Sequence, residues 1–261
     1  MKRVVLFIVV SLTWIAAADA ATPDYEREGR LVEEMTLNLF EGEIVTLNDG
    51  ERDFAGVWLE ADDARGTVIL LHGRGYHADW QDVVGPVRVL LAESGWNTLS
   101  LQMPVLETGA RYYDYWPLFP ESDRRIDAGI AWARQAAEGP LILLGHSCGA
   151  HMSMHWVSTG GGADAVDALV FAGLGATDWG QELVEPYPFE AIEVPVLDAI
   201  GALEYERVLK MADERRAWLA EVTHPDSIQV RIEGADHYFK DRNRELGEAV
   251  VEWLQSLDFG R

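Results

Sequence analysis

Residues 141–150 decide the fold, and they read Leu141-Ile142-Leu143-Leu144-Gly145-His146-Ser147-Cys148-Gly149-Ala150. The apolar run at 141–144 predicts a strand that is buried on both faces, as in a parallel sheet covered by helices. The glycines around Ser147 complete the pattern G-x-S-x-G, and a helix-compatible segment follows. This combination is typical of a nucleophile elbow, a tight strand-to-helix turn that exposes a serine hydroxyl. In such a turn the main-chain N–H of Cys148 points to where an oxyanion would form.

Strand and helix signals alternate on both sides of this stretch. Buried strands are predicted at 67–71, 96–102, 168–174, 194–200 and 227–232. Helices are predicted between them, with Asp79 and Ser122 as N-caps of helices that end near residues 94 and 137. The sequence therefore predicts the α/β class, with one mostly parallel central sheet that has helices on both faces.

Two further β segments are predicted before the first parallel strand, at Thr36–Leu47 and Phe54–Glu60. The turn signal Asn48-Asp49-Gly50 lies between them and indicates an N-terminal antiparallel hairpin.

The first twenty residues have the pattern of a secretory signal peptide. Lys2 and Arg3 form a basic start, an apolar stretch runs from Val4 to Ala18, and Ala18-Asp19-Ala20 resembles a cleavage site. The apolar stretch is short for a membrane span. We therefore expect residues 1–20 to be removed and residues 21–261 to form a single periplasmic or secreted domain without stable membrane insertion.

Composition narrows the classes of partner. The formal net charge of −23 disfavours binding to nucleic acid and to anionic lipid, because both carry negative charge. Cys148 is the single cysteine, so no internal disulfide can form, and its place inside the elbow predicts a packed side chain. A small-molecule substrate is the partner that this composition favours.

The segment from Met103 to Pro120 is rich in aromatic residues and has no sustained helix or strand period. It follows a parallel strand, at the sheet edge where ligands bind. We interpret Tyr112, Tyr113, Tyr115 and Trp116 as one wall of a substrate pocket, the alternative being a loop packed over the core. The stretch 176–193 is short for a lid domain, so little or no lid is expected.

Three motifs in order resemble the α/β-hydrolase superfamily: His72-Gly73 after a buried strand, the elbow at Ser147, and Gly234-Ala235-Asp236-His237 after the last strand. More narrowly, 71–75, Gly95-Trp96, 102–104 and 195–198 resemble a group of exported bacterial proteins that have this fold and no assigned function. The resemblance implies a fold and a catalytic apparatus but no substrate.

A serine hydroxyl needs a general base to attack a carbonyl near neutral pH. The resemblance implies that His237 is that base, because the loop after the last strand lies over the elbow in this fold. It also implies that main-chain N–H groups of Cys148 and Arg74 stabilise the oxyanion, with His72 and Gly73 beside the substrate.

The acid of the triad is left open between two carboxylates. Gly201-Ala202-Leu203-Glu204 matches the G-x-x-D pattern of the superfamily, with Glu in place of Asp. Asp198 is the alternative, although it lies within a predicted strand, and Asp178 is a weaker third candidate.

No metal or cofactor is expected. His151 and His155 share one helix face, but Met152 stands where a zinc motif has glutamate, so helix packing is the simpler interpretation. The guanidinium of Arg74 is expected to pair with one of the many carboxylates. The leading hypothesis is a serine hydrolase that acts on an ester or related acyl compound through an acyl-enzyme. The alternatives are a catalytically silent binding protein of the cell envelope and an acyltransferase.

Overall fold

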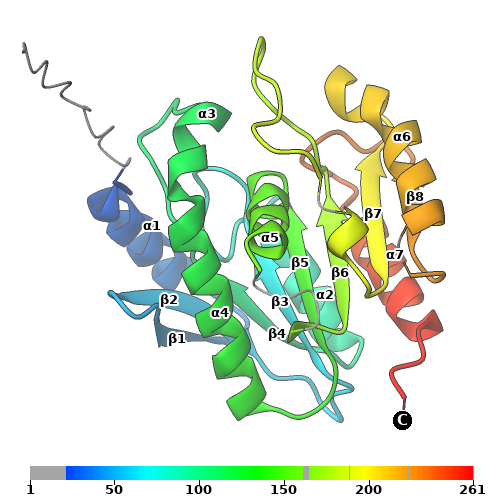
Figure 1. Ribbon diagram of the computed structural model, residues 1–261. Helices are drawn as coiled ribbons and strands as arrows, with labels where there is room; N and C mark the ends of the chain where they lie inside the picture. The colour runs from blue at the N-terminus through cyan, green and yellow to red at the C-terminus, as the bar shows by residue number, and fades with distance from the viewer. Residues whose placement is uncertain (1–21, 161–164, 188, 223, 261) are drawn as a thin grey trace, which may run out of the picture.

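A computed structural model describes residues 22–160, 165–187, 189–222 and 224–260. Its centre is a sheet of eight strands in the order β1-β2-β4-β3-β5-β6-β7-β8 (Figure 1). The strands are β1 Glu43–Asn48, β2 Asp53–Leu59, β3 Thr67–Leu71, β4 Asn97–Leu101, β5 Leu141–His146, β6 Ala168–Ala172, β7 Val196–Gly201 and β8 Ile228–Ile232. The α-helices are α1 Tyr25–Asn38, α2 Val84–Glu93, α3 Tyr112–Tyr115, α4 Phe119–Ala136, α5 Cys148–Ser158, α6 Glu206–Val222 and α7 Asn243–Ser256.

The pairing of the strands confirms the predicted mostly parallel sheet. Strands β4, β3, β5, β6, β7 and β8 pair in parallel, whereas β2 is antiparallel to both β1 and β4. The predicted N-terminal hairpin is present as β1 and β2, with Asn48 opposite Asp53 across the turn. Six carboxyl ends of parallel strands therefore share one sheet edge, where a ligand site is expected in open α/β sheets.

Successive residues of the central strands face two hydrophobic cores. Ile69 and Leu143 pack with residues of α4 and α5, whereas their neighbours Leu70 and Leu144 pack with residues of α2 and α7. Strands β3, β5 and β6 bury apolar side chains on both faces because helices cover both faces of the sheet. Figure 1 shows α4 and α5 in front of the sheet and α2 and α7 behind it.

The prediction of a strand that starts at Thr36 was wrong, because residues 25–38 form helix α1. Asp24 caps this helix, and its carboxylate accepts a hydrogen bond from the main-chain N–H of Arg27 at 2.9 Å. The helix is mostly polar, and Glu28 and Met35 are its buried residues. The buried guanidinium of Arg125 in α4 holds it in place through a 3.0 Å ion pair with Glu28.

Two predicted helix starts were also wrong. Helix α2 begins at Val84 and not at Asp79, because the Asp79 carboxylate pairs with the buried Arg88 guanidinium at 2.7 Å. Helix α4 begins at Phe119, so Ser122 lies inside its first turns, where the hydroxyl donates to a main-chain carbonyl. The segment 103–120, expected to lack regular structure, contains the short helix α3 and a 3₁₀ turn at Trp116–Leu118.

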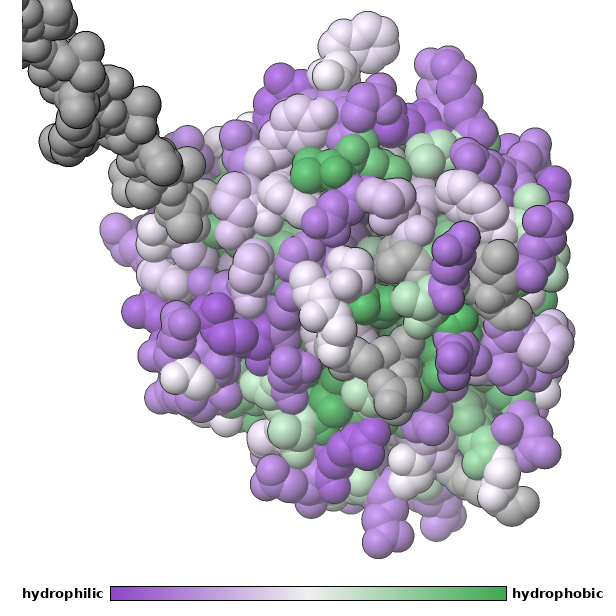
Figure 2. All heavy atoms as spheres, in the orientation of Figure 1, coloured by the Kyte–Doolittle hydropathy of each residue, from purple (hydrophilic) through white to green (hydrophobic). Residues whose placement is uncertain are grey.

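The connection from β6 to β7 carries one 3₁₀ turn, at Phe189–Ala191, and no α-helix among its described residues, in keeping with the prediction of little or no lid. Within the described ranges, every helix is too short or too polar to cross a membrane. The predicted signal peptide, residues 1–20, lies outside the described residues. The face drawn in Figure 2 is mostly hydrophilic, with smaller hydrophobic areas between the polar side chains.

Candidate active site

Ser147 lies in a strained turn between β5 and α5. Its backbone angles are φ 52° and ψ −115°, a conformation that residues other than glycine rarely adopt. A Cβ at position 145 would lie 2.6 Å from the carbonyl oxygen of Gly149, and a Cβ at position 149 would lie 2.5 Å from the carbonyl oxygen of Leu71. Both glycines of the G-x-S-x-G pattern are therefore required by close main-chain contacts.

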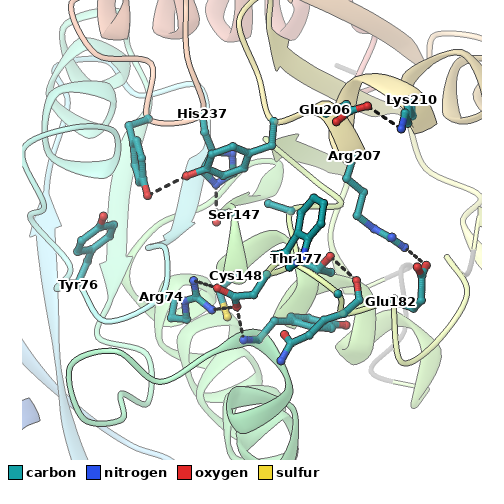
Figure 3. A pocket seen from close by; sticks show the side chains of 18 residues that line it. Arg74, Tyr76, Ser147, Cys148, Thr177, Glu182, Glu206, Arg207, Lys210 and His237 are labelled. Atoms are coloured by element: carbon teal, nitrogen blue, oxygen red, sulfur yellow. Dashed lines mark hydrogen bonds and ion pairs between the residues drawn. The ribbon is translucent and has the colours of Figure 1, made fainter.

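Three side chains from separate loops form a chain of hydrogen bonds. The Oγ atom of Ser147 lies 2.8 Å from Nε2 of His237, and Nδ1 of the same imidazole lies 2.5 Å from Oε1 of Glu204 (Figure 3). His237 and Glu204 are 3% and 5% exposed, so bulk water does not compete for these contacts. With the carboxylate as acceptor, Nδ1 carries the proton and Nε2 is free to accept the serine proton.

The two rival carboxylates have other partners. Asp198 is fully buried within β7, where it pairs with Nε of Arg215 at 2.8 Å and accepts a 2.8 Å hydrogen bond from Gln229. Asp178 pairs with the guanidinium of Arg74. The structure thus brings Glu204 against the imidazole of His237 and holds Asp198 and Asp178 elsewhere.

The two residues whose main-chain N–H groups are expected to stabilise an oxyanion are Cys148 and Arg74. Cys148 is the first residue of α5, a position whose N–H has no intrahelical partner, and Arg74 follows the end of β3. Both residues line the same cavity as Ser147. Burial raises the pKa of the Cys148 thiol to about 12, so this side chain stays protonated and is not a second nucleophile.

Two buried, neutral histidines, His72 and His146, bind main-chain groups of the loops that carry Arg74 and His237. His72 donates through Nδ1 to the carbonyl of Gly73 at 2.7 Å and accepts through Nε2 from the N–H of Met103 at 2.9 Å. His146 lies 3.0 Å from the carbonyl oxygen of His237 through its Nε2 atom. Burial lowers the pKa of both imidazoles to about 3, so they hold the loops as neutral groups.

Sequence reasoning missed His146 and a second supporting residue, Arg27. The guanidinium of Arg27, in α1, donates to the carbonyls of Gly75 at 2.9 Å and Leu106 at 2.6 Å. It thereby links helix α1 to the loop that carries Arg74 and to the segment after β4. A helix signal at 25–38 would have been needed to find it.

A cavity of about 630 Å³ opens above Ser147 at the carboxyl edge of the sheet. Its lining residues are Arg74, Tyr76, Tyr112, Ser147, Cys148, Ala176, Thr177, Asp178, Trp179, Gly180, Gln181, Glu182, Tyr205, Glu206, Arg207, Lys210, His237 and Tyr238. The loop at 176–182 and the start of α6 contribute many of them, and sequence analysis singled out neither as a wall.

The predicted aromatic wall is only partly placed at this cavity. Tyr112 lines it, whereas the buried Tyr115 accepts a hydrogen bond from the N–H of Leu106, and Trp116 borders a separate small cavity of about 20 Å³. Tyr113 braces the 176–182 loop, because its hydroxyl accepts from the N–H of Glu182 at 2.8 Å. His72 and Gly73 lie below the cavity and are not among the described residues that line it.

Each cationic side chain of the cavity has an acidic partner. Arg74 pairs with Asp178, as the sequence favoured, while Arg207 pairs with Glu182 at 2.5 Å and Lys210 with Glu206 at 2.7 Å. Figure 3 shows the pairs of Arg207 and Lys210 on one side of the cavity and Arg74 on another. The site is therefore polar but carries little unpaired positive charge.

The remaining histidines of α5 serve packing contacts. Nε2 of His151 lies 3.1 Å from the carbonyl of Ala176, and Nδ1 of His155 lies 3.0 Å from Asp123. Among the described residues, no group of three or more histidine, cysteine or acidic side chains is arranged to hold a metal ion.

Solved structures with the same arrangement of strands and helices are numerous. A dienelactone hydrolase from Anabaena variabilis matches with a TM-score of 0.64 at 18% identity, over 82% of this chain and 97% of that one. The esterase Pf2001 from Pyrococcus furiosus matches with a TM-score of 0.63 at 17% identity, over 83% and 92% of the two chains. The chain has the α/β-hydrolase fold. A third α/β-hydrolase-fold structure, XC6422 from Xanthomonas campestris, is described as a serine hydrolase without lid and matches at a TM-score of 0.59 and 16% identity, over 83% and 95%.

Sequence comparison adds one family. A model described as "Protein of unknown function (DUF3530)" matches residues 9–112, which include α1, the hairpin and the segment with His72 but not the elbow. The search of curated proteins found no match.

Proposed function

We propose that this protein is a serine hydrolase that cleaves an ester or a related acyl compound through an acyl-enzyme on Ser147. The observation that carries the proposal is the chain of contacts from Ser147 Oγ to His237 and on to Glu204, at 2.8 and 2.5 Å. Such a chain supplies a nucleophile with a positioned base and a carboxylate that stabilises the charged base.

The reaction would proceed in two halves. In the first, Ser147 Oγ attacks the substrate carbonyl carbon while its proton passes to His237 Nε2, and the resulting oxyanion accepts hydrogen bonds from the N–H groups of Cys148 and Arg74. The intermediate collapses, the bond to the leaving alcohol breaks, and His237 returns the proton to that alcohol. In the second half, water attacks the acyl carbon while His237 takes its proton. The bond between the acyl carbon and Ser147 Oγ then breaks, His237 returns the proton to Oγ, and the carboxylic acid departs.

Hydrolysis of p-nitrophenyl esters tests this proposal. Wild-type protein should release nitrophenol from the acetate ester, and Ser147→Ala should reduce kcat by a factor on the order of 10⁴ or more. Arg30→Ala is a suitable control, because the Arg30 side chain is 57% exposed and pairs only with Glu26 on the same helix face. Wild-type activity equal to that of Ser147→Ala would contradict the proposal.

We also propose that residues 1–20 direct export and are removed. Helix α1 begins at Tyr25 with Asp24 as its cap, so cleavage after Ala20 would leave the helix and its contacts intact. The intact mass of protein recovered from the periplasm or the medium should correspond to a chain that starts at Ala21. A mature chain that retains the first twenty residues would contradict this.

A further inference from the structure

The walls of the cavity contain very few aliphatic residues. Among the described residues that line it, Ala176 is the single aliphatic side chain. Five aromatic side chains also line it, namely Tyr76, Tyr112, Trp179, Tyr205 and Tyr238. A long acyl chain gains about 0.8 kcal/mol for each buried CH₂ group only where a continuous apolar wall encloses it, and here charged side chains, among them Arg74, Arg207 and Lys210, lie between the rings. The cavity therefore suits a short acyl group.

The cavity is much larger than a short acyl group requires. Its volume of about 630 Å³ is in the range of sites for whole small molecules, about 300 to 1,000 Å³. The space beside Ser147 must then receive mainly the alcohol half of the substrate.

Trp179 gives the mouth of the cavity a large, flat aromatic surface. Its side chain is 94% exposed, although the loop around it is firmly held. The carbonyl of Trp179 accepts from Arg111 at 2.6 Å, and the hydroxyl of Thr177 donates to the carbonyl of Gln181 at 2.9 Å. An indole ring kept in water on a fixed loop is a preorganised surface for stacking.

Polar groups with both donors and acceptors surround these rings. Arg207 with Glu182, and Lys210 with Glu206, present paired cations and carboxylates along one side of the cavity (Figure 3). Such pairs can donate to and accept from neighbouring hydroxyl groups. Because the cations are paired and the chain has a net charge of −23, a neutral ligand is favoured over an anionic one.

We propose that the substrate is a neutral sugar that carries a short acyl ester, with Trp179 stacking on the sugar ring. This inference rests on the proposed function and specifies its substrate class. The aromatic rings contact the C–H face of the sugar, the paired charges bind its hydroxyls, and the acyl group lies at Ser147.

The test compares three substrates: 6-O-acetylglucose, p-nitrophenyl acetate and p-nitrophenyl octanoate. p-Nitrophenyl acetate should be cleaved far faster than p-nitrophenyl octanoate. In Trp179→Ala, the ratio of kcat/KM for 6-O-acetylglucose to that for p-nitrophenyl acetate should fall on the order of tenfold. Trp179→Tyr should restore most of the ratio, because it retains a ring.

Phe40→Ala is the matched control. The Phe40 side chain is also 94% exposed but does not line the cavity, so its removal should leave the ratio unchanged. An unchanged ratio in Trp179→Ala, or faster cleavage of p-nitrophenyl octanoate than of p-nitrophenyl acetate, overturns the proposed substrate class. If a fluorophosphonate still labels Ser147 in that case, the proposed function as a serine hydrolase stands. If wild-type protein is neither labelled nor active on any ester, the proposed function fails as well.

Discussion

Replacing Glu204 with glutamine should separate the triad acid from its rivals. The variant keeps the shape of the side chain but removes a negative charge 2.5 Å from Nδ1 of His237. At an effective dielectric constant of about 20, unit charges about 3 to 4 Å apart attract by about 4 to 6 kcal/mol. Because that attraction favours the imidazolium formed in the transition state, kcat should fall by roughly 10³ to 10⁴.

The matched control is Asp198→Asn, at a carboxylate inside β7, six residues before Glu204, that pairs with Arg215. Breaking this buried pair should lower the free energy of unfolding by about 3 to 5 kcal/mol. The kcat of the folded fraction should nevertheless stay within a few-fold of wild type. The assay is nitrophenol release, with the folded fraction measured by circular dichroism. A larger loss of kcat in Asp198→Asn than in Glu204→Gln would refute the assignment of Glu204.

Three further predictions concern the supports of the site. Arg27→Ala should lower kcat about ten- to hundredfold with a smaller change in KM, because the loop that carries Arg74 loses its link to α1. Arg30→Ala, on the same helix, should leave kcat unchanged. Steady-state kinetics measure both variants. Gly149→Ala should lower the free energy of unfolding by about 3 kcal/mol or more, because the added Cβ would lie 2.5 Å from the carbonyl oxygen of Leu71. Gly29→Ala should raise it by about 0.5 to 1 kcal/mol, because the added Cβ lies in open space on helix α1. Urea unfolding measures both changes. Burial lowers the pKa of His151 from 6.5 to about 4, so between these pH values only the unfolded chain binds a proton at this residue, and stability falls as the pH falls from about 6.5 to about 4. His151→Gln should reduce the slope of the unfolding free energy against pH by up to about 1.4 kcal/mol per pH unit. An unchanged slope would contradict a neutral, buried His151.

Much of the sheet could be predicted because the decisive signals are local. The apolar runs at β3, β5 and β6 require cover on both faces, and that requirement alone indicates a parallel sheet between helices. The G-x-S-x-G pattern is also readable in the sequence, although only Gly145 makes its close contacts within the motif, with Gly149 and Ala150, whereas Gly149 contacts Leu71 at the end of β3. Ser147 was expected from this pattern, whereas His237 was expected from the resemblance to the superfamily, which implies a histidine in the loop after the last strand.

The supports of the site depend on contacts that local sequence does not contain. Glu204 and Asp198 are six residues apart, and what separates their roles is Arg215, which pairs with Asp198 from helix α6. Arg27 reaches a loop 48 residues away, from a helix whose composition is mostly polar. The cavity wall at Trp179 comes from a loop with no periodic signal at all. In each case a long-range partner, and not a propensity, fixes the geometry.

Covalent labelling tests the activation of Ser147 by His237 most directly. Wild-type protein treated with a fluorophosphonate should gain the mass of one adduct, and the modified peptide should contain Ser147. Ser147→Ala should gain none, and His237→Ala should react at least a hundredfold more slowly. Labelling of His237→Ala at the wild-type rate, or an adduct on a residue other than Ser147, would contradict the account.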